Sequence, residues 1–351
     1  MIVTLSLLLS FTRVDGAAQV EAVRKELEVP ALGLAIVDLA DPETKIWVNG
    51  VRKVGEEPPK PVQVSDMWHL GSCTKAISAA TLAILANEKK ISLDSPLSKA
   101  FSGMTVSPSR RSVTLRDLLA MRGGIDANPP ATWWKYAGNQ GTAVKQREAA
   151  TKDGLFDEMK ASSGEFTYSN WSYVMAAYSA ERATGKSIEE LMEEKIFKPL
   201  KMKVGFGPLA ANQPFPHRDN VPHNSSMGSM DNPPVMTAAG RAHMSLEDWA
   251  KFIREVLLAY KEDSRVLPKL YWKEIKGPNT WDKYSMGWVL AERDWAKGFA
   301  LNHAGSNTFY CSLVWVAPEL GKAYLAVTND GGKRGEAAVS KILERAISSG
   351  L

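Results

Sequence analysis

The chain has 351 residues, of which 44% are hydrophobic and 23% charged, the balance of a soluble globular protein. At about 150 residues per domain, this length suggests roughly two lobes. The formal net charge is +4, and lysine and arginine are spread along the chain, which argues against nucleic-acid binding. The two cysteines, Cys73 and Cys311, are too few for a metal cage or a disulfide framework, so each is expected to be a small buried side chain.

Residues 1–17 have features of a secretory signal peptide. Residues 2–11 form an apolar run that is too short to cross a bilayer, and Gly16 and Ala17 offer small residues for cleavage. No lysine or arginine precedes the run, so a misplaced start or a leader that stays attached are the alternatives. We expect a periplasmic or secreted protein with no stable membrane insertion after cleavage.

Hydrophobic periodicity and capping residues predict the elements in chain order. A helix is expected up to Pro30, then a hairpin, then a long helix that begins at Ser72. A mixed region with one short helix leads into two further helices, a long loop rich in Pro, Asn and Gly, and another helix. Four strand-like runs and a last helix close the chain. The expected helices cover residues 17–29, 72–90, 114–121, 170–184, 187–200, 245–260 and 334–348, and the strands 31–42, 45–54, 284–295, 298–306, 310–319 and 322–330.

This order predicts an α/β (α+β) fold in which the two ends of the chain join in one antiparallel sheet flanked by helices. Residues 18–351 then form a single domain. Its α/β lobe takes residues 18–66 and 241–351, and the inserted, mainly helical lobe takes residues 67–240. A site is expected in a cleft between the lobes.

The segment "GSCTK" holds the one Ser-x-x-Lys of the chain, Ser72 and Lys75. Residues three apart lie on one face of a helix, about 5–6 Å apart at Cβ. A lysine buried against an apolar helix has a depressed pKa and could take the proton of a serine nucleophile. About one such match is expected by chance in a chain of this length, so the spacing alone leaves an accident of composition open.

Two further groups of residues could serve the same chemistry. In "TYSNW", Tyr168 could act as a base or proton relay and Asn170 could hold a carbonyl or amide, although an aromatic core residue and an Asn N-cap would read the same way. In "NHAGSN", Gly305 would allow close approach to a strand, the Ser306 amide could face a ligand, and His303 could be a cation or a donor. An ordinary strand end is the alternative.

Together and in this order, the three groups resemble the motifs of the serine β-lactamase and penicillin-binding-protein superfamily. The likeness is nearest to its class C-like branch, which includes family VIII esterases, D-aminopeptidases and D-alanyl-D-alanine carboxypeptidases. The surrounding text, "DLLAMRGGI", "AAGRAHMSLEDWAKFI", "YSMGW" and above all "GEFTYSNWSYVMAAYSAERATGKSIEELMEEKIFKPLKM", is also similar, and the likeness covers roughly residues 20–345. The resemblance implies a β-lactamase/transpeptidase-like fold.

The resemblance also implies roles. Ser72 is the acylated nucleophile, Lys75 its activating partner and Tyr168 the general base. Asn170, His303, Gly305 and Ser306 bind substrate, and the Ser72 and Ser306 amides form the oxyanion hole. The family's third motif commonly has Lys-Thr, whereas this chain has His303-Ala304, which weakens the anchor for a substrate carboxylate.

The expected function is therefore a serine hydrolase that acts through an acyl-enzyme, without cofactor or metal, on a small ester, an amide or a D-amino-acid peptide. A β-lactamase, or a penicillin-binding sensor that is acylated without efficient turnover, is the alternative. A metal hydrolase built on "PHRDNVPH" (His217, Asp219 and His223) is disfavoured because no helix fixes the spacing of these residues. The aromatic residues of "TWWKY" could line the cleft or pack within the lobe.

Overall fold

A seven-stranded antiparallel sheet lies at the centre of the structure, a computed structural model that describes residues 15–130, 132–138, 141–157, 164–277 and 284–351. The strand order is β2-β1-β12-β11-β10-β9-β8. Strand β1 pairs with the last strand, β12, so the two ends of the chain meet in one sheet, as predicted. The strands are β1 (Ala31–Asp38), β2 (Lys45–Gly50), β8 (Tyr284–Ser285), β9 (Trp288–Arg293), β10 (Gly298–Ser306), β11 (Cys311–Ala317) and β12 (Lys322–Thr328).

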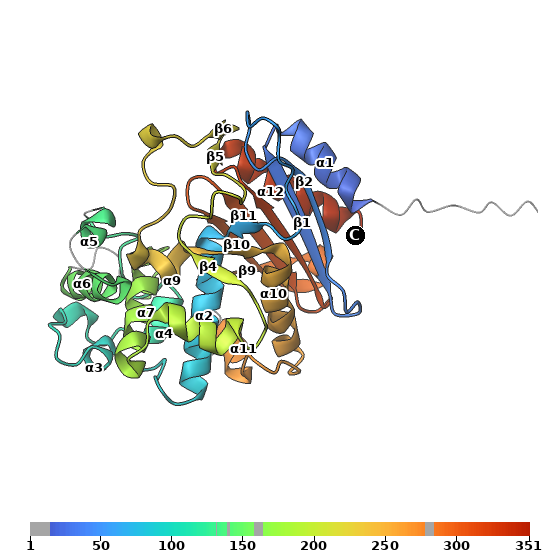
Figure 1. Ribbon diagram of the computed structural model, residues 1–351. Helices are drawn as coiled ribbons and strands as arrows, with labels where there is room; N and C mark the ends of the chain where they lie inside the picture. The colour runs from blue at the N-terminus through green and yellow to red at the C-terminus, as the bar shows by residue number, and fades with distance from the viewer. Residues whose placement is uncertain (1–14, 131, 139–140, 158–163, 278–283) are drawn as a thin grey trace, which may run out of the picture.

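Helices cover both faces of this sheet (Figure 1). The terminal helices α1 (Gly16–Glu26) and α12 (Lys333–Ser348) pack on one face, while α10 (Leu246–Tyr260) packs on the other. Side chains of β1 alternate between the two layers, as the period of a strand requires: Leu32 and Leu34 belong to the core under α1 and α12, and Ala35 and Val37 to the main core. This arrangement confirms the predicted fold class.

A mainly helical part lies beside the sheet (Figure 1). A small sheet in the order β3-β7-β4 and the two-stranded β5-β6 lie outside the main sheet. The remaining α-helices are α2 (Thr74–Asn87), α3 (Leu97–Ala100), α4 (Leu115–Leu119), α5 (Trp134–Ala137), α6 (Ala143–Phe156), α7 (Asn170–Thr184), α8 (Ile188–Met192), α9 (Thr237–Gly240) and α11 (Lys269–Lys276). The short strands are β3 (Met67–His69), β4 (Val204–Phe206), β5 (His217–Arg218), β6 (Val221–Pro222) and β7 (Ala242–Ser245).

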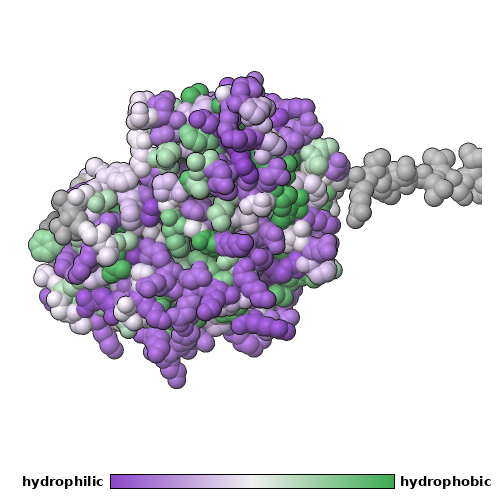
Figure 2. Space-filling view, in the orientation of Figure 1, coloured by the Kyte–Doolittle hydropathy of each residue, from purple (hydrophilic) through white to green (hydrophobic). Residues whose placement is uncertain are grey.

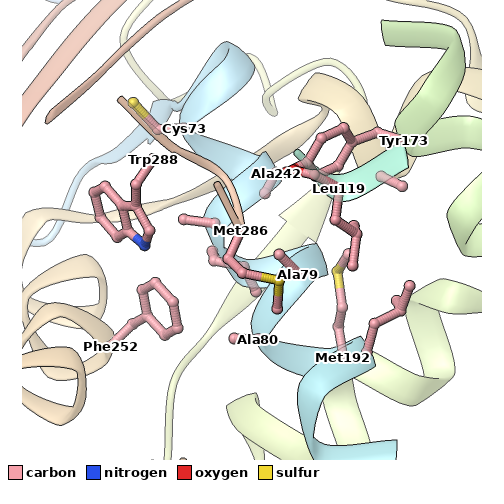
Figure 3. Packing of buried hydrophobic residues seen from close by; sticks show 14 of the residues in the cluster. Cys73, Ala79, Ala80, Leu119, Tyr173, Met192, Ala242, Phe252, Met286 and Trp288 are labelled. Atoms are coloured by element: carbon pink, nitrogen blue, oxygen red, sulfur yellow. Dashed lines mark hydrogen bonds between the residues drawn. The ribbon is translucent and has the colours of Figure 1, made fainter. Parts of the chain in front are cut away.

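Helix α2 runs through the main core, and every residue from Thr74 to Leu85 is buried. Its sequence is rich in alanine, which favours a helix and lets neighbouring elements approach closely. Figure 3 shows Ala79 and Ala80 of α2, with Trp288 and Phe252 on one side and Leu119, Tyr173 and Met192 on the other. The first turn of α2, which carries the Ser-x-x-Lys lysine, is therefore fixed by packing on all sides.

Several elements differ from the sequence prediction. The helices α3, α5, α9 and α11 and the short strands β3 to β7 were not expected, and two longer elements show why prediction failed. Helix α6 was not expected, because its buried face includes Gln146 and Arg147 and so lacks an apolar stripe; Arg147 is held there by Glu181 and Glu189. The predicted strand over residues 284–295 is broken into β8 and β9. At the break, a Cβ on Gly287 would lie 2.4 Å from Cα of Ala76, so this turn packs directly on α2.

Residues 1–14 of the predicted signal segment lie outside the described residues, and Gly16 and Ala17 begin α1. Among the described residues, no helix is both long and apolar enough to cross a membrane. The face seen in Figure 2 mixes hydrophilic and hydrophobic residues.

Candidate active site

Ser72 lies in a 3₁₀ turn, Gly71–Cys73, that leads directly into α2. The turn is attached on two sides. Leu70 donates its amide to Ala242 O over 2.9 Å, and its carbonyl accepts from Ser312 Oγ over 2.8 Å. Its neighbour Cys73 is not a competing nucleophile, because burial raises the pKa of its thiol to about 12.

Lys75 is fully buried, and its Nζ lies 3.1 Å from Ser72 Oγ. The same Nζ donates to Asn170 Oδ1 over 2.8 Å and to Ala239 O over 2.6 Å. Burial lowers the pKa of Lys75 from its ordinary 10.5 to about 7. A neutral amine has two hydrogens, which match the asparagine and carbonyl oxygens, and one lone pair, which then faces the serine hydroxyl.

Tyr168 and Asn170 reach this centre from the start of α7. Ser169 caps the helix, since its Oγ accepts from the Ser172 amide over 2.9 Å. The cap is therefore not Asn170, whose side chain is free to meet Lys75. The ring centroid of Tyr168 lies 5.0 Å from Lys75 Nζ. Desolvation raises the pKa of the Tyr168 hydroxyl to about 12 and its interaction with Ser72 opposes that rise, although 36% of the residue's surface is exposed.

The end of β10 lies against the serine turn. Gly71 has a φ of +48°, and a Cβ there would sit 2.3 Å from Ser306 N. A Cβ on Gly305 would sit 2.0 Å from Leu70 O. Two glycines thus bring the Ser306 backbone beside the turn of Ser72. At this end of β10, Ala304 and Ser306 are exposed, whereas Gly305 is buried.

His303 is only 3% exposed. Its Nδ1 lies 2.7 Å from Ala304 O and its Nε2 lies 3.0 Å from the Tyr284 hydroxyl, so the carbonyl fixes the proton on Nδ1 and Nε2 accepts from the tyrosine. Burial, and then the charge of Lys75, lower its pKa to about 3. The ring lies 6.4 Å from that of Tyr168, so His303 belongs to the site as a buried neutral group.

Asn128 also belongs to this group and was not singled out in the sequence. Its Oδ1 accepts from Asn170 Nδ2 over 3.0 Å and from Trp133 Nε1 over 2.8 Å. The "TWWKY" aromatics therefore divide: Trp133 is linked to the site, whereas Tyr136 is buried in the helical part and donates to Asp153. Asn128 lies in a Pro-rich loop and in no recognised motif, so sequence patterns could not identify it.

The alternative metal site does not form. Within the described residues, no group of three or more His, Cys, Asp or Glu side chains is placed to hold a metal ion. His217 is buried, and its Nε2 accepts from the Val54 amide over 3.1 Å. His223 instead contacts Gly228 O with its Nε2, 2.9 Å away.

A family model described as beta-lactamase matches residues 19–347. The chain belongs to this family. The family consists of hydrolytic serine enzymes, so the resemblance seen in the sequence is confirmed. The motif roles within this chain stay predictions.

Curated relatives are distant. The unguisins hydrolase ungD' of Aspergillus campestris is 25% identical over 257 residues, which cover 69% of this chain and 47% of the relative. PbpX of Bacillus subtilis, named as a penicillin-binding protein, is 22% identical over 227 residues, covering 64% of this chain and 54% of its own length. The chain spans about half the length of both curated relatives.

Two solved structures show the same fold. The D-amino acid amidase of Ochrobactrum anthropi, complexed with L-phenylalanine, has a TM-score of 0.72 at 18% identity, covering 95% of this chain and 98% of that one. The class C beta lactamase of Rhodobacter sphaeroides has a TM-score of 0.72 at 16% identity, covering 95% and 99%. At these identities the likeness concerns the fold.

Proposed function

We propose that this protein is a serine hydrolase that forms an acyl-enzyme on Ser72 and hydrolyses small esters or amides, as a carboxylesterase or a D-peptidase does. The observation that carries the proposal is the contact between Ser72 Oγ and the buried Lys75 Nζ, 3.1 Å apart, with a lysine pKa of about 7. A neutral amine near pH 7 is a competent base for a hydroxyl nucleophile.

In this mechanism Ser72 Oγ attacks the substrate carbonyl carbon and its proton passes to Lys75 Nζ. The resulting ammonium has three acceptors around it, Ser72 Oγ, Asn170 Oδ1 and Ala239 O, so the same site accommodates the lysine after the transfer. The carbonyl oxygen becomes an oxyanion facing the amides of Ser72 and Ser306. The C–O or C–N bond then breaks, and the leaving group takes the proton back.

Tyr168 acts in this proposal as a neutral relay rather than a phenolate base, because a hydroxyl with a pKa of about 12 stays protonated at neutral pH. It passes the proton from Lys75 to the leaving group. In the second half-reaction a water attacks the acyl carbon and gives its proton to the same pair. The bond between the acyl carbon and Ser72 Oγ then breaks, Oγ takes that proton back, and the carboxylic acid leaves.

His303 affects which class of substrate the site accepts. A histidine with a pKa near 3 carries no charge at neutral pH, and Ala304 supplies no hydroxyl, so neither residue replaces the Lys-Thr anchor of a substrate carboxylate. We therefore expect neutral esters and amides to be turned over better than β-lactams. Turnover or slow acylation by a β-lactam is the alternative function, which the name of the relative PbpX favours.

The experiment is active-site labelling. A fluorophosphonate and a labelled penicillin are each incubated with the protein, and the adduct is mapped by mass spectrometry. We expect a Ser72 adduct, none in Ser72→Ala, and normal labelling in the matched control Ser109→Ala, an exposed serine elsewhere. Labelling at another residue, or undiminished esterase activity in Ser72→Ala, contradicts the proposal.

Substrate choice is measured as kcat/KM for nitrocefin against p-nitrophenyl butyrate. We expect the ester to be preferred, and His303→Lys to shift the ratio toward nitrocefin. A wild-type preference for nitrocefin supports the β-lactamase alternative, and a single burst without turnover supports the sensor. A D-alanyl peptide in the same panel tests the D-peptidase activity.

We also propose that the protein is exported. Cell fractionation of the full chain, followed by N-terminal sequencing, tests this proposal.

A further inference from the structure

A buried histidine–aspartate pair lies directly behind the proposed oxyanion hole. His69 and Asp231 are 1% and 5% exposed, and His69 Nε2 lies 2.8 Å from Asp231 Oδ1. The contact has the distance of a hydrogen bond but not its preferred angle. Neither residue belongs to the serine, tyrosine or third-motif groups.

The histidine end of the pair holds the serine turn. The Gly71 amide donates to His69 Nδ1 over 3.0 Å. Nδ1 therefore keeps its lone pair and the ring proton sits on Nε2, the nitrogen beside Asp231. Gly71 is the residue whose positive φ brings the turn against Ser306 N, and it immediately precedes Ser72. The position of the Ser72 amide thus depends on His69.

The aspartate end holds the other side of the proposed hole. Asp231 Oδ1 accepts from Asn307 Nδ2 over 3.2 Å, and Asn307 directly follows Ser306. Burial alone would raise the pKa of Asp231, but His69, Arg241 and Asn307 together hold it below its usual value, so the carboxylate stays charged. One carboxylate oxygen therefore lies between the segments that carry the two oxyanion amides.

A third arm reaches the lysine. The Asn232 amide donates to Asp231 Oδ1 over 2.7 Å, and Asn232 Nδ2 donates to Gly240 O over 2.8 Å. Gly240 follows Ala239, whose carbonyl accepts from Lys75 Nζ. The segment around Asp231 thus connects all three stretches of backbone on which the proposed chemistry depends.

We propose that His69 and Asp231 form a positioning pair that sets the spacing of the Ser72 and Ser306 amides, so that both donate to the oxyanion of the transition state. This proposal rests on the proposed function. The pair contacts no substrate. It acts because amide donors stabilise developing charge only when they are held at hydrogen-bond distance from the oxyanion beforehand.

The test compares an oxoester with the thionoester of the same acyl group. Sulfur is a larger and weaker hydrogen-bond acceptor than oxygen, so a thionoester gains less from aligned oxyanion donors, and the oxo/thiono ratio of kcat reports their alignment. A general loss of folded enzyme lowers both rates equally and leaves this ratio unchanged. The ratio therefore separates positioning from stability.

The variants are Asp231→Asn and His69→Gln, with His243→Gln as the matched control. His243 is also a buried histidine, paired with His69 across β3 and β7, but it contacts Gly207 O. We expect the oxoester kcat of the two pair variants to fall about 10- to 100-fold, less than the loss of a whole oxyanion donor, with KM within about twofold and the oxo/thiono ratio reduced at least about fivefold. The control should keep the ratio.

Asn307→Ala leaves His69 and Asp231 in place and removes the arm between Asp231 and the Ser306 turn, together with the contacts of the Asn307 amide with Met230 O and the Phe309 amide. It serves if the pair variants do not fold, and its ratio should also fall. Fluorophosphonate labelling of Ser72 is followed in the same wild-type sample. No wild-type adduct overturns both proposals. An adduct with an unchanged ratio in the folded variants, or an equal drop in the His243 control, overturns the positioning pair alone.

Discussion

The pKa of Lys75 gives the sharpest prediction. If the neutral amine takes the proton of Ser72, the acylation rate follows the fraction of neutral lysine. With a pKa of about 7, that fraction is about 9% at pH 6 and about 91% at pH 8, a rise of roughly tenfold followed by a plateau. An ordinary lysine of pKa 10.5 would instead give about a hundredfold rise over the same range with no plateau.

The assay is stopped-flow acylation by a neutral ester, such as p-nitrophenyl butyrate, from pH 5.5 to 10. We expect one ascending limb with its midpoint near 7. No descending limb should follow below pH 10, because Tyr168 with a pKa of about 12 remains protonated throughout. Tyr168→Phe keeps the ring beside Lys75 but removes the hydroxyl, so it should lower the rate without moving the midpoint.

Lys75→Arg is the complementary variant, because a guanidinium does not deprotonate in this range and its residual rate should be independent of pH. The exposed Lys152→Arg is the matched control and should reproduce the wild-type profile. The reasoning is refuted if the wild-type rate keeps rising tenfold per pH unit beyond pH 9, or if Lys75→Arg keeps the midpoint near 7.

Three further predictions concern stability and backbone geometry. Lys75 binds its proton less tightly in the folded protein than in the unfolded chain. The free energy of unfolding of the wild type relative to Lys75→Met should therefore rise between about pH 7 and 10.5, by up to about 1.4 kcal/mol per pH unit. Urea unfolding at several pH values measures this, and no change across the window would contradict burial of the amine. Gly71→Ala should lose activity at least about 100-fold, since the new Cβ would lie 2.3 Å from Ser306 N, and wild-type kcat would contradict this. Arg147→Met should cost about 3–5 kcal/mol by leaving Glu181 buried without its partner, and a calorimetric loss below about 1 kcal/mol would argue against that pairing.

The sequence by itself predicted the fold class and the order of the main-sheet strands and of most long helices. It did so because the signals were local: the hairpin of residues 31–54, the alanine-rich helix after Ser72 and the C-terminal strands each have a clear period. It failed at α6, where the buried face includes Arg147, which is held by acidic residues distant in sequence. Periodicity detects apolar faces and cannot detect a buried ion pair.

The candidate motifs were also local, and their likeness to a family identified them before any geometry was known. What the tertiary structure decided was their protonation. His303 reads in the sequence as a residue with an ordinary pKa, yet burial and the nearby lysine make it a neutral group with a pKa near 3. For Lys75 the apolar helix already suggested a depressed pKa, and the structure adds its cause, because the core encloses α2 on all sides.

Only the fold could bring His69 and Asp231 together. They are 162 positions apart, and neither lies in a recognisable motif, so nothing in the sequence connects them. Sequence patterns report which side chains share one helix face or one strand. The distances between segments, which set the donor spacing of an oxyanion site and the charge of a buried side chain, depend on how the whole chain packs.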